Sequence, residues 1–314
     1  MDLLTALLLS PLPVFGLLAP AADQLFHALK RKLVPYWTLA PLVISLCAAL
    51  ALLLQSQPAS TLLYGVLILD PMSLLFAVIF LFISMLVNIT SISYMRETEN
   101  PLAYYGLLLF STFGMVLVSL SIDLVVLFVS WELMSVPTYV LTGILKKDPA
   151  SNEAAVKYFL ISAFSSGLII YAISLLFGVT GSTNMLVIGE RLGTRSLLFE
   201  PLTVLAIALF VAGFGMKVAA VPFHMWIPDA YEGAPTTIAA LLAAGTKSGG
   251  FAALLRVFLV SLAFFRADWS AIFAGVALMT MTLGNVAALM QKSFTRLLAY
   301  SSIAQSGYIL IGLA

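Results

Sequence analysis

Three ionisable side chains, Glu132, Lys217 and Lys247, lie within stretches of sequence that are otherwise apolar enough to sit in a lipid bilayer. A charge near the centre of a bilayer costs roughly 3 kcal/mol on insertion scales, so charged residues kept at that depth usually mark an ion or proton pathway. We therefore expect these three residues to take part in ion or proton movement.

Glu132 lies about ten residues into a predicted helix over 122–145, near the middle of the membrane. Burial disfavours a charged carboxylate and a nearby cation favours it, so the charge of Glu132 depends on its partner. Pro137 removes one helical hydrogen bond and leaves the carbonyl of Leu133 free to bind water or to allow a bend. The structural alternative is a static ion pair that locks two helices together, and we favour the functional role.

Lys217 closes an apolar run just after Gly213 and Gly215 and five residues before Pro222. This composition predicts a broken helix, which a membrane tolerates where the freed backbone faces protein or a water-filled cavity. Burial disfavours a charged lysine and an approaching carboxylate favours it, so a small motion can load or release a proton. The alternatives are that Lys217 extends to the cytoplasmic interface or, more distantly, that it acts as a covalent catalyst.

Lys247 lies eleven residues after the start of the predicted span 236–262 and nine before Arg256, too deep to extend to an interface. Gly245 and Gly249 flank it at the GxxxG spacing that lets a neighbouring helix approach closely. Helix packing explains the two glycines but gives no reason for the lysine. We therefore favour a functional role for Lys247.

Two other candidates carry open alternatives. His224 follows the broken helix in a segment predicted to be cytoplasmic, together with Asp229 and Glu232, where a proton-uptake role and a structural role in capping the loop are equally open. A metal site usually needs more than one His or Cys, so none is predicted. Lys157 lies four residues after Glu153, as an ordinary helix pair or as part of the proton path, and we favour the helix pair.

Composition predicts an all-α, polytopic membrane protein. Hydrophobic residues make up 62% and charged residues 9% of the 314 residues, against about 45 to 50% apolar residues in soluble domains. The net charge of +1 gives no basic field for nucleic acid. The single cysteine, Cys47, builds neither an intrachain disulfide nor a cysteine-based metal site, so redox centres are expected in other proteins.

A hydrocarbon core about 30 Å thick needs about 20 helical residues. Runs of that length predict ten spans, at 3–22, 36–54, 72–94, 102–120, 122–145, 154–178, 201–222, 236–262, 269–290 and 295–314. The first is the weakest, because Pro11 and Pro13 interrupt it, and its lack of preceding Lys or Arg argues against a signal peptide. The last has no polar exit, so we expect the sequence to continue in a longer chain.

The distribution of basic residues predicts the orientation. Alternating loops place eight Lys and Arg on one side and three on the other: Lys30, Arg31, Lys32, Arg96, Lys146, Lys147, Lys292 and Arg296 against Arg191, Arg195 and Arg266. By the positive-inside rule the first side is cytoplasmic, so the N-terminus is expected outside. Residues 139–144 also resemble 308–313, five spans later, which is either a chance match or the trace of an inverted five-helix repeat.

Three segments carry a family resemblance: SWELMSVPTYVLTGIL at 130–145, KVAAVPFHMWIPDAYEGAP at 217–235 with the helix through Lys247, and KSFTRLLAYSSIAQSGYILIGLA at 292–314. Together they resemble the antiporter-like membrane subunits of complex I, most of all subunit N (subunit 2) of NADH-quinone oxidoreductase. The resemblance covers about residues 65–314. It implies fourteen helices with two inverted five-helix repeats and a broken seventh helix, hence an N-terminal three-helix region at 1–101, a first repeat at 102–265 and the start of a second at 266–314.

The resemblance also implies roles for the buried charges. Glu132 resembles the fifth-helix glutamate that modulates a partner lysine, Lys217 resembles that broken-helix lysine, and Lys247 resembles the central lysine of the eighth helix. The sequence departs from the family by stopping before the second broken helix, whose ionisable residue should complete the outward exit. A chain that truly ended there would lack a complete channel.

The predicted function is a non-redox, proton-translocating subunit of a complex I-like NADH-quinone oxidoreductase or related dehydrogenase, multi-pass in the plasma (inner) membrane of a bacterium or archaeon. No cofactor or metal is expected in this chain, and quinone, flavin or deazaflavin and iron-sulfur clusters are expected in partners. The partners are other antiporter-like and small helical membrane subunits and, indirectly, peripheral redox subunits. The alternatives are a subunit of a multi-subunit cation/proton antiporter, a hydrogenase-type complex, or a structural subunit whose charges only fix helix packing.

Overall fold

The computed structural model describes residues 3–18, 33–55, 58–95, 101–194 and 201–314. Over these residues the chain is an all-α helical bundle, and seven of its helices are long and apolar enough to cross a membrane. The predicted all-α, multi-pass membrane fold is therefore confirmed. Five of the basic residues that predict the orientation lie outside the described residues: Lys30, Arg31, Lys32, Arg96 and Arg195.

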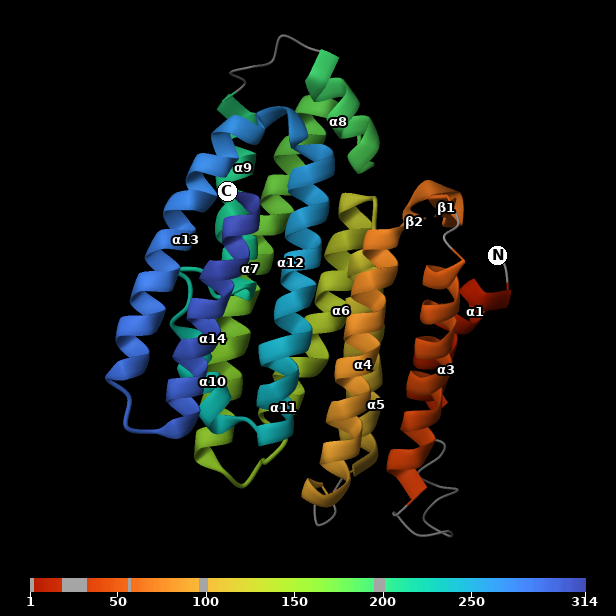
Figure 1. The fold of residues 1–314 in the computed structure, drawn as a ribbon, viewed down its shortest axis with the longest axis vertical. Helices are drawn as coiled ribbons and strands as arrows, with labels where there is room; N and C mark the ends of the chain where they lie inside the picture. The colour runs from red at the N-terminus through yellow and green to blue at the C-terminus, as the bar shows by residue number, and fades with distance from the viewer. Residues whose placement is uncertain (1–2, 19–32, 56–57, 96–100, 195–200) are drawn as a thin grey trace.

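The helices line up across the bundle in nearly their order along the chain. Figure 1 shows α1 and α3 at one edge, α4, α5, α6 and α12 in the middle, and α13 and α14 at the opposite edge. The seven apolar spans are α3 (Val34–Leu54), α4 (Pro71–Tyr94), α5 (Pro101–Leu120), α6 (Leu124–Thr142), α7 (Pro149–Thr180), the helix Thr236–Ser261 that contains α12, and Ala263–Leu289, which contains α13 (Arg266–Leu289).

The remaining predicted spans are shorter than expected or only partly described. The span at 201–222 is α9 (Pro201–Lys217), the span at 295–314 is α14 (Phe294–Leu310), and the first span begins with α1 (Leu3–Leu9). Besides a helix within the segment that follows the predicted break, described below, two further elements were not predicted. They are the short helix α8 (Met185–Thr194) and an antiparallel hairpin of β1 (Ser60–Leu62) and β2 (Leu67–Leu69).

Aspartate side chains fix the first residues of three membrane helices. Asp70 accepts a hydrogen bond from the Ser73 amide (2.8 Å) at the start of α4, and Asp123 accepts one from the Val125 amide (2.9 Å) at the start of α6. Asp148 accepts one from the Ala150 amide (3.0 Å) at the start of α7. Each bond satisfies an amide that has no partner inside its helix. The cap on α6 sets the depth of Glu132, nine residues further on.

The eighth predicted span is one continuous helix with two wider turns. It consists of α11 (Thr236–Ala240), a π-helical turn (Leu241–Thr246), α12 (Lys247–Arg256) and a second π-helical turn (Val257–Ser261). Single π-helical turns are rare and often occur at functional sites. Lys247 is the first residue after such a turn.

A buried ion pair ties the far end of α12 to two other helices. Arg256 is only 3% exposed and binds Asp70 through both guanidinium ends, Nη1 to Oδ2 at 2.5 Å and Nη2 to Oδ1 at 2.9 Å. Its Nη2 also donates to the carbonyl of Ser119 on α5 at 2.8 Å. Burial acts to raise the pKa of Asp70, but the hydrogen bonds and charge of Arg256, with those of Ser73, hold that pKa below its usual value. Bidentate, charge-assisted bonds of this kind fix position strongly.

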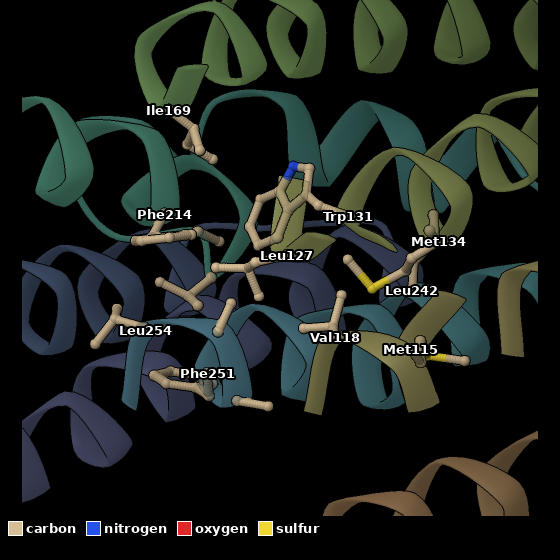
Figure 2. Close-up of a cluster of buried hydrophobic side chains, with 14 of the residues drawn as sticks. Met115, Val118, Leu127, Trp131, Met134, Ile169, Phe214, Leu242, Phe251 and Leu254 are labelled. Carbon is tan, nitrogen blue, oxygen red and sulfur yellow. The ribbon is translucent and has the colours of Figure 1, made fainter. Parts of the chain in front are cut away.

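The apolar core surrounds the segments that carry the candidate residues. Figure 2 shows Leu127 and Trp131 of α6 beside Phe214 of α9, above Phe251 and Leu254 of α12. The Trp131 and Phe214 rings are 5.4 Å apart and inclined at 67°. Because Trp131 precedes Glu132 and Phe214 lies three residues before Lys217, this core holds both charged residues at fixed positions.

Glycines let helices approach closely around this core. A Cβ atom on Gly249 would lie 2.6 Å from the Met134 sulfur, and one on Gly245 would lie 3.2 Å from the Met115 sulfur, which confirms the predicted close approach of this helix to its neighbours. The tightest approach is at Gly114 of α5, where a Cβ would lie 2.2 Å from the backbone nitrogen of Met134. A side chain has no room at that position.

Gly114→Ala is expected to destabilise the protein by about 1–3 kcal/mol or more, because the added methyl group forces the backbones of α5 and α6 apart. The check is thermal unfolding of the purified full-length protein in detergent. The matched control is Gly178→Ala on α7, where a Cβ would meet open space, and where alanine gains up to about 1 kcal/mol of helix propensity. Equal unfolding temperatures for Gly114→Ala and the wild type would contradict the close packing.

Candidate functional site

The predicted broken helix is present and its ends are tied together. α9 ends at Lys217, and helix resumes as α10 (Trp226–Gly233) after an irregular turn. The indole nitrogen of Trp226 donates to the carbonyl of Met216 at 3.0 Å, which also accepts from the Ala219 amide at 3.2 Å, and this bond ties the start of α10 to the end of α9. Part of the segment predicted as a cytoplasmic loop is therefore helical, and it packs against α7 and α14.

Lys217 is held in a box of hydroxyl groups and aromatic faces. Its side chain is 4% exposed, and Nζ donates to the hydroxyls of Ser135 and Tyr158, both at 2.8 Å. The rings of Trp131, Tyr139 and Tyr158 lie 5.9, 5.9 and 5.1 Å from Nζ. Aromatic faces attract a cation without holding it as a carboxylate does. The alternative that Lys217 extends to the interface is excluded by its burial.

Glu132 lies on α6, the helix that supplies Trp131 and Ser135 to this box, and it is bound to a hydroxyl rather than to a cation. Its Oε1 accepts a hydrogen bond from Ser166 of α7. Within the described part of the chain, Glu132 forms no ion pair with Lys217 or with any other basic group. The static ion pair considered as the structural alternative is thus absent from this structure.

Tyr158 connects Lys217 to neighbouring helices. Its hydroxyl lies 2.8 Å from Lys217 Nζ and 3.1 Å from the hydroxyl of Thr138, and its ring stacks on Trp226 with centroids 4.5 Å apart and planes 11° apart. α6, α7 and both halves of the broken helix therefore meet at one phenol. A phenol hydroxyl can donate and accept at once, which suits a group that passes a proton on.

Lys247 also binds neutral oxygens. Its side chain is 5% exposed, and Nζ donates to the hydroxyl of Ser302 on α14 at 2.6 Å and to the Ser302 carbonyl at 2.9 Å. The residues that the structure describes provide no carboxylate in ion-pair contact with it. Lys247 therefore faces polar atoms of a neighbouring helix and not lipid.

Lys157 and His224 lie away from these buried contacts. Lys157 is 44% exposed and binds Glu153 and Asp229, each at 2.7 Å, so the predicted helix pair with Glu153 is present. Arg296 binds Asp229 from the other side at 3.2 Å. His224 lies in the turn between α9 and α10, half-buried, and its Nδ1 has no hydrogen-bond partner among the described residues.

Several residues of the site were not found by sequence reasoning. Four hydroxyl residues bind the three charged groups: Ser135, Tyr158, Ser166 and Ser302. Each lies on a different helix from the group that it binds, and serine and tyrosine are common in membrane helices. Ser135 alone carried a local signal, three residues after Glu132 on the same helix face.

The arrangement favours reversible protonation over bond-making chemistry. Two lysines and one glutamate are joined to hydroxyl groups that can relay protons, and the described residues contain no cluster of three or more His, Cys, Asp or Glu that could hold a metal ion. A buried amine bound to neutral oxygens can lose or gain a proton without breaking a salt bridge. Such groups are suited to proton movement.

Residues 121–314 match the family model described as NADH:quinone oxidoreductase/Mrp antiporter, TM. The chain is 44% identical over 245 residues to F(420)H(2) dehydrogenase subunit N of Methanosarcina mazei, covering 78% of this chain and 49% of that protein. It is 46% identical over 251 residues to NADH-quinone oxidoreductase subunit N 2 of Roseiflexus castenholzii, covering 79% of this chain and 50% of that protein. The chain thus spans about half the length of these relatives.

Solved structures give the same fold. A chain of respiratory complex I from Thermus thermophilus superposes with a TM-score of 0.78 at 31% identity, covering 96% of this chain and 64% of that one. A chain of the Mrp complex from a Dietzia species superposes with a TM-score of 0.85 at 22% identity, covering 100% of this chain and 59% of that one.

Proposed function

This chain belongs to the family of transmembrane subunits shared by NADH:quinone oxidoreductases and Mrp antiporters, and from that membership we propose that it relays protons across the membrane through Glu132, Lys217 and Lys247. It does so as a non-redox subunit of a complex I-like dehydrogenase. Quinone, flavin or deazaflavin and iron-sulfur clusters belong to its partner subunits, which include further antiporter-like membrane subunits.

The observation that carries the proposal is the way the two lysines are bound. Each is nearly fully buried, and each donates to neutral oxygens, Lys217 to Ser135 and Tyr158 and Lys247 to Ser302. A lysine kept only to lock helices together would be expected in contact with a carboxylate, because an unpaired buried charge is costly. Neutral partners instead leave the amine free to exist with or without its extra proton.

The relay we infer begins at the break in the helix. Lys217 takes a proton there, and the negative charge of Glu132 on the neighbouring helix face favours its protonated form. The ammonium group then gives its proton to a hydroxyl or water beside it, with Ser135 and Tyr158 as the protein groups in direct contact. Lys247, neutral at that moment, receives a proton, and Lys217 returns to the neutral amine.

The arrangement of the whole molecule is part of the proposal. We place a three-helix region at 1–101, a first five-helix repeat at 102–265 and the start of a second, inverted repeat at 266–314, with the N-terminus outside. In this orientation Lys157 lies at the cytoplasmic end of the site. His224, with its Nδ1 facing no described partner, is a candidate for proton uptake near the break.

The rival function is that of a subunit in a multi-subunit cation/proton antiporter. It rests on the fold shared with the Mrp chain, and it would use the same buried residues without any electron donor. A hydrogenase-type complex is a related possibility. The greater similarity to dehydrogenase subunits, 44% and 46% identity, favours the first function.

Purification of the full-length protein from its native membrane tests the proposal. We expect it to co-purify with iron-sulfur subunits, and inverted membrane vesicles that contain the complex to acidify when an electron donor and a quinone are supplied. Acidification is read with a fluorescent amine and must disappear on addition of an uncoupler. Purification without redox subunits, together with cation-driven proton exchange, would support the antiporter instead.

A further inference from the structure

Ser302 holds Lys247 by two different atoms. Lys247 Nζ lies 2.9 Å from the Ser302 carbonyl oxygen and 2.6 Å from its hydroxyl oxygen. The carbonyl can only accept a hydrogen bond, whereas the hydroxyl can also donate one. Besides helping to hold the amine, the hydroxyl therefore places an exchangeable proton beside Lys247.

Tyr231 lies on the other side of that hydroxyl. It belongs to α10, the second half of the broken helix, and its side chain is 5% exposed. Its hydroxyl lies 3.5 Å from the Ser302 hydroxyl, and either oxygen can be the donor. Tyr231, Ser302 and Lys247 therefore form a row of three exchangeable groups drawn from three different elements.

The same two elements, α10 and α14, meet again at the surface through charged side chains. Arg296 binds Glu232 at 2.7 Å and Asp229 at 3.2 Å, and Ser293 donates to Glu232 at 3.0 Å. We refer to Asp229, Glu232, Ser293 and Arg296 as the charged seam. These side chains are partly exposed, and two of them, Asp229 and Glu232, flank Tyr231 in sequence on α10.

The charged seam lies a short distance along α14 from the buried hydroxyl of Ser302. Arg296 and Ser302 are six residues apart on α14, about 9 Å along a helix. The phenol ring of Tyr231 points into that interval, because its backbone lies beside the seam and its hydroxyl reaches Ser302. Figure 1 shows α10 and α14 side by side at this end of the bundle, and the two helices are in contact.

We propose that Tyr231 and Ser302 form a hydroxyl bridge that carries protons between the charged seam and Lys247. In each transfer toward the lysine, the Ser302 hydroxyl gives its proton to the neutral amine and takes one from the Tyr231 hydroxyl. Tyr231 is restored by a proton from the aqueous side of the seam. No electrons are exchanged, and both hydroxyls end as they began.

This inference rests on the proposed function, but it goes further. It assigns relay roles to two residues outside the three buried charges, and it connects Lys247 with the surface without passing through Lys217. The contact between α10 and α14 thereby becomes a route as well as a packing interface.

The test uses the full-length protein in its complex, with the variants Ser302→Ala and Tyr231→Phe. Ser302→Ala removes the hydroxyl but keeps the carbonyl that positions Lys247. Tyr231→Phe removes one oxygen from a buried ring. Loss of a positioned proton-transfer group slows transfer by about 10²–10⁴-fold, and because water can partly replace a hydroxyl we expect proton pumping to fall at least about tenfold at normal complex assembly.

Matched controls lie on the same helix. Ser301→Ala removes the adjacent hydroxyl, which has no hydrogen bond to any residue that the structure describes, and Tyr308→Phe removes a phenol oxygen that binds Asn285 (2.8 Å) instead of Ser302. Both are expected to pump as the wild type does. Ser302→Thr, which restores a hydroxyl, is expected to recover pumping.

The outcomes separate this inference from the proposed function. The hydroxyl bridge alone is overturned if Lys247→Ala abolishes pumping but Ser302→Ala and Tyr231→Phe pump as the wild type does. A wild-type complex that does not pump overturns the proposed function. Equal losses in Ser302→Ala and Ser302→Thr at normal assembly would also overturn the bridge, since a restored hydroxyl would then make no difference.

Discussion

Replacement of Lys247 by alanine is expected to lower proton pumping at least about tenfold while the complex still assembles. In the proposed relay, the amine is the group of the eighth span that takes up and releases the proton. Its removal leaves the Ser302 hydroxyl and carbonyl without the amine that donates to them. The folding cost is expected to be small because the carbonyl still accepts from the Ser306 hydroxyl at 3.1 Å and the hydroxyl keeps its contact with Tyr231 at 3.5 Å. Pumping per electron transferred is the measurement, alongside the amount of assembled complex.

The variant Lys247→Arg distinguishes two roles for the Lys247 side chain, that of a proton carrier and that of a fixed structural charge. Arginine keeps the positive charge and the hydrogen-bond donors, but it is effectively never deprotonated. We expect Lys247→Arg to pump as poorly as Lys247→Ala. A variant that carries arginine and pumps normally would show that a fixed charge is sufficient at this position, and the relay role of Lys247 would be wrong.

Lys217→Met is expected to have an effect of similar size, at least about tenfold on pumping. Methionine is close to lysine in length and fills the space among Trp131, Tyr139 and Tyr158, but it cannot hold a proton. The hydroxyls of Ser135 and Tyr158 lose a partner, at a cost of about 1–3 kcal/mol for buried polar groups left unsatisfied. We therefore expect a modest fall in thermal stability together with a nearly complete loss of pumping.

The matched control for Lys217→Met is Lys146→Met, which replaces an exposed lysine in the loop between α6 and α7. Surface substitutions of this kind usually change stability by less than about 0.5 kcal/mol, and pumping should stay at the wild-type level. Pumping at the wild-type level by Lys217→Met as well as by Lys146→Met would contradict the role of Lys217. Comparable losses would point to a general effect of removing positive charge.

The sequence alone identified the residues whose cost in a membrane is high. Glu132, Lys217 and Lys247 stand out because each interrupts an apolar run, and the break after Lys217 follows from its glycines and proline. These signals lie within short stretches of sequence, so they can be recognised without knowing which helices pack together.

The partners of those residues carry no such signal. Ser302 lies 55 residues from Lys247 along the chain and Tyr158 lies 59 from Lys217, and a serine or tyrosine in a membrane helix is common. Only the folded arrangement shows which hydroxyl reaches which amine. Arg256 was taken simply as the far end of a span, because its partner Asp70 is 186 residues away.

The short elements were missed for a different reason. The hairpin of β1 and β2 has three residues in each strand, too few for an alternating pattern to stand out from the neighbouring apolar run. Helix α8 is more polar than the membrane spans and shorter than the length searched for. Ten residues of helix are too few to cross a bilayer.

The bond between Arg256 and Asp70 anchors one end of the helix that bears Lys247. About 13 Å of α12 separates the arginine from the lysine, and the π-helical turn at 241–246 lies just beyond the lysine. If α12 tilts when Lys247 changes charge, the end held by Arg256 stays fixed and the end that bears Lys247 moves. The π-helical turn at 241–246 is then the hinge that absorbs this movement.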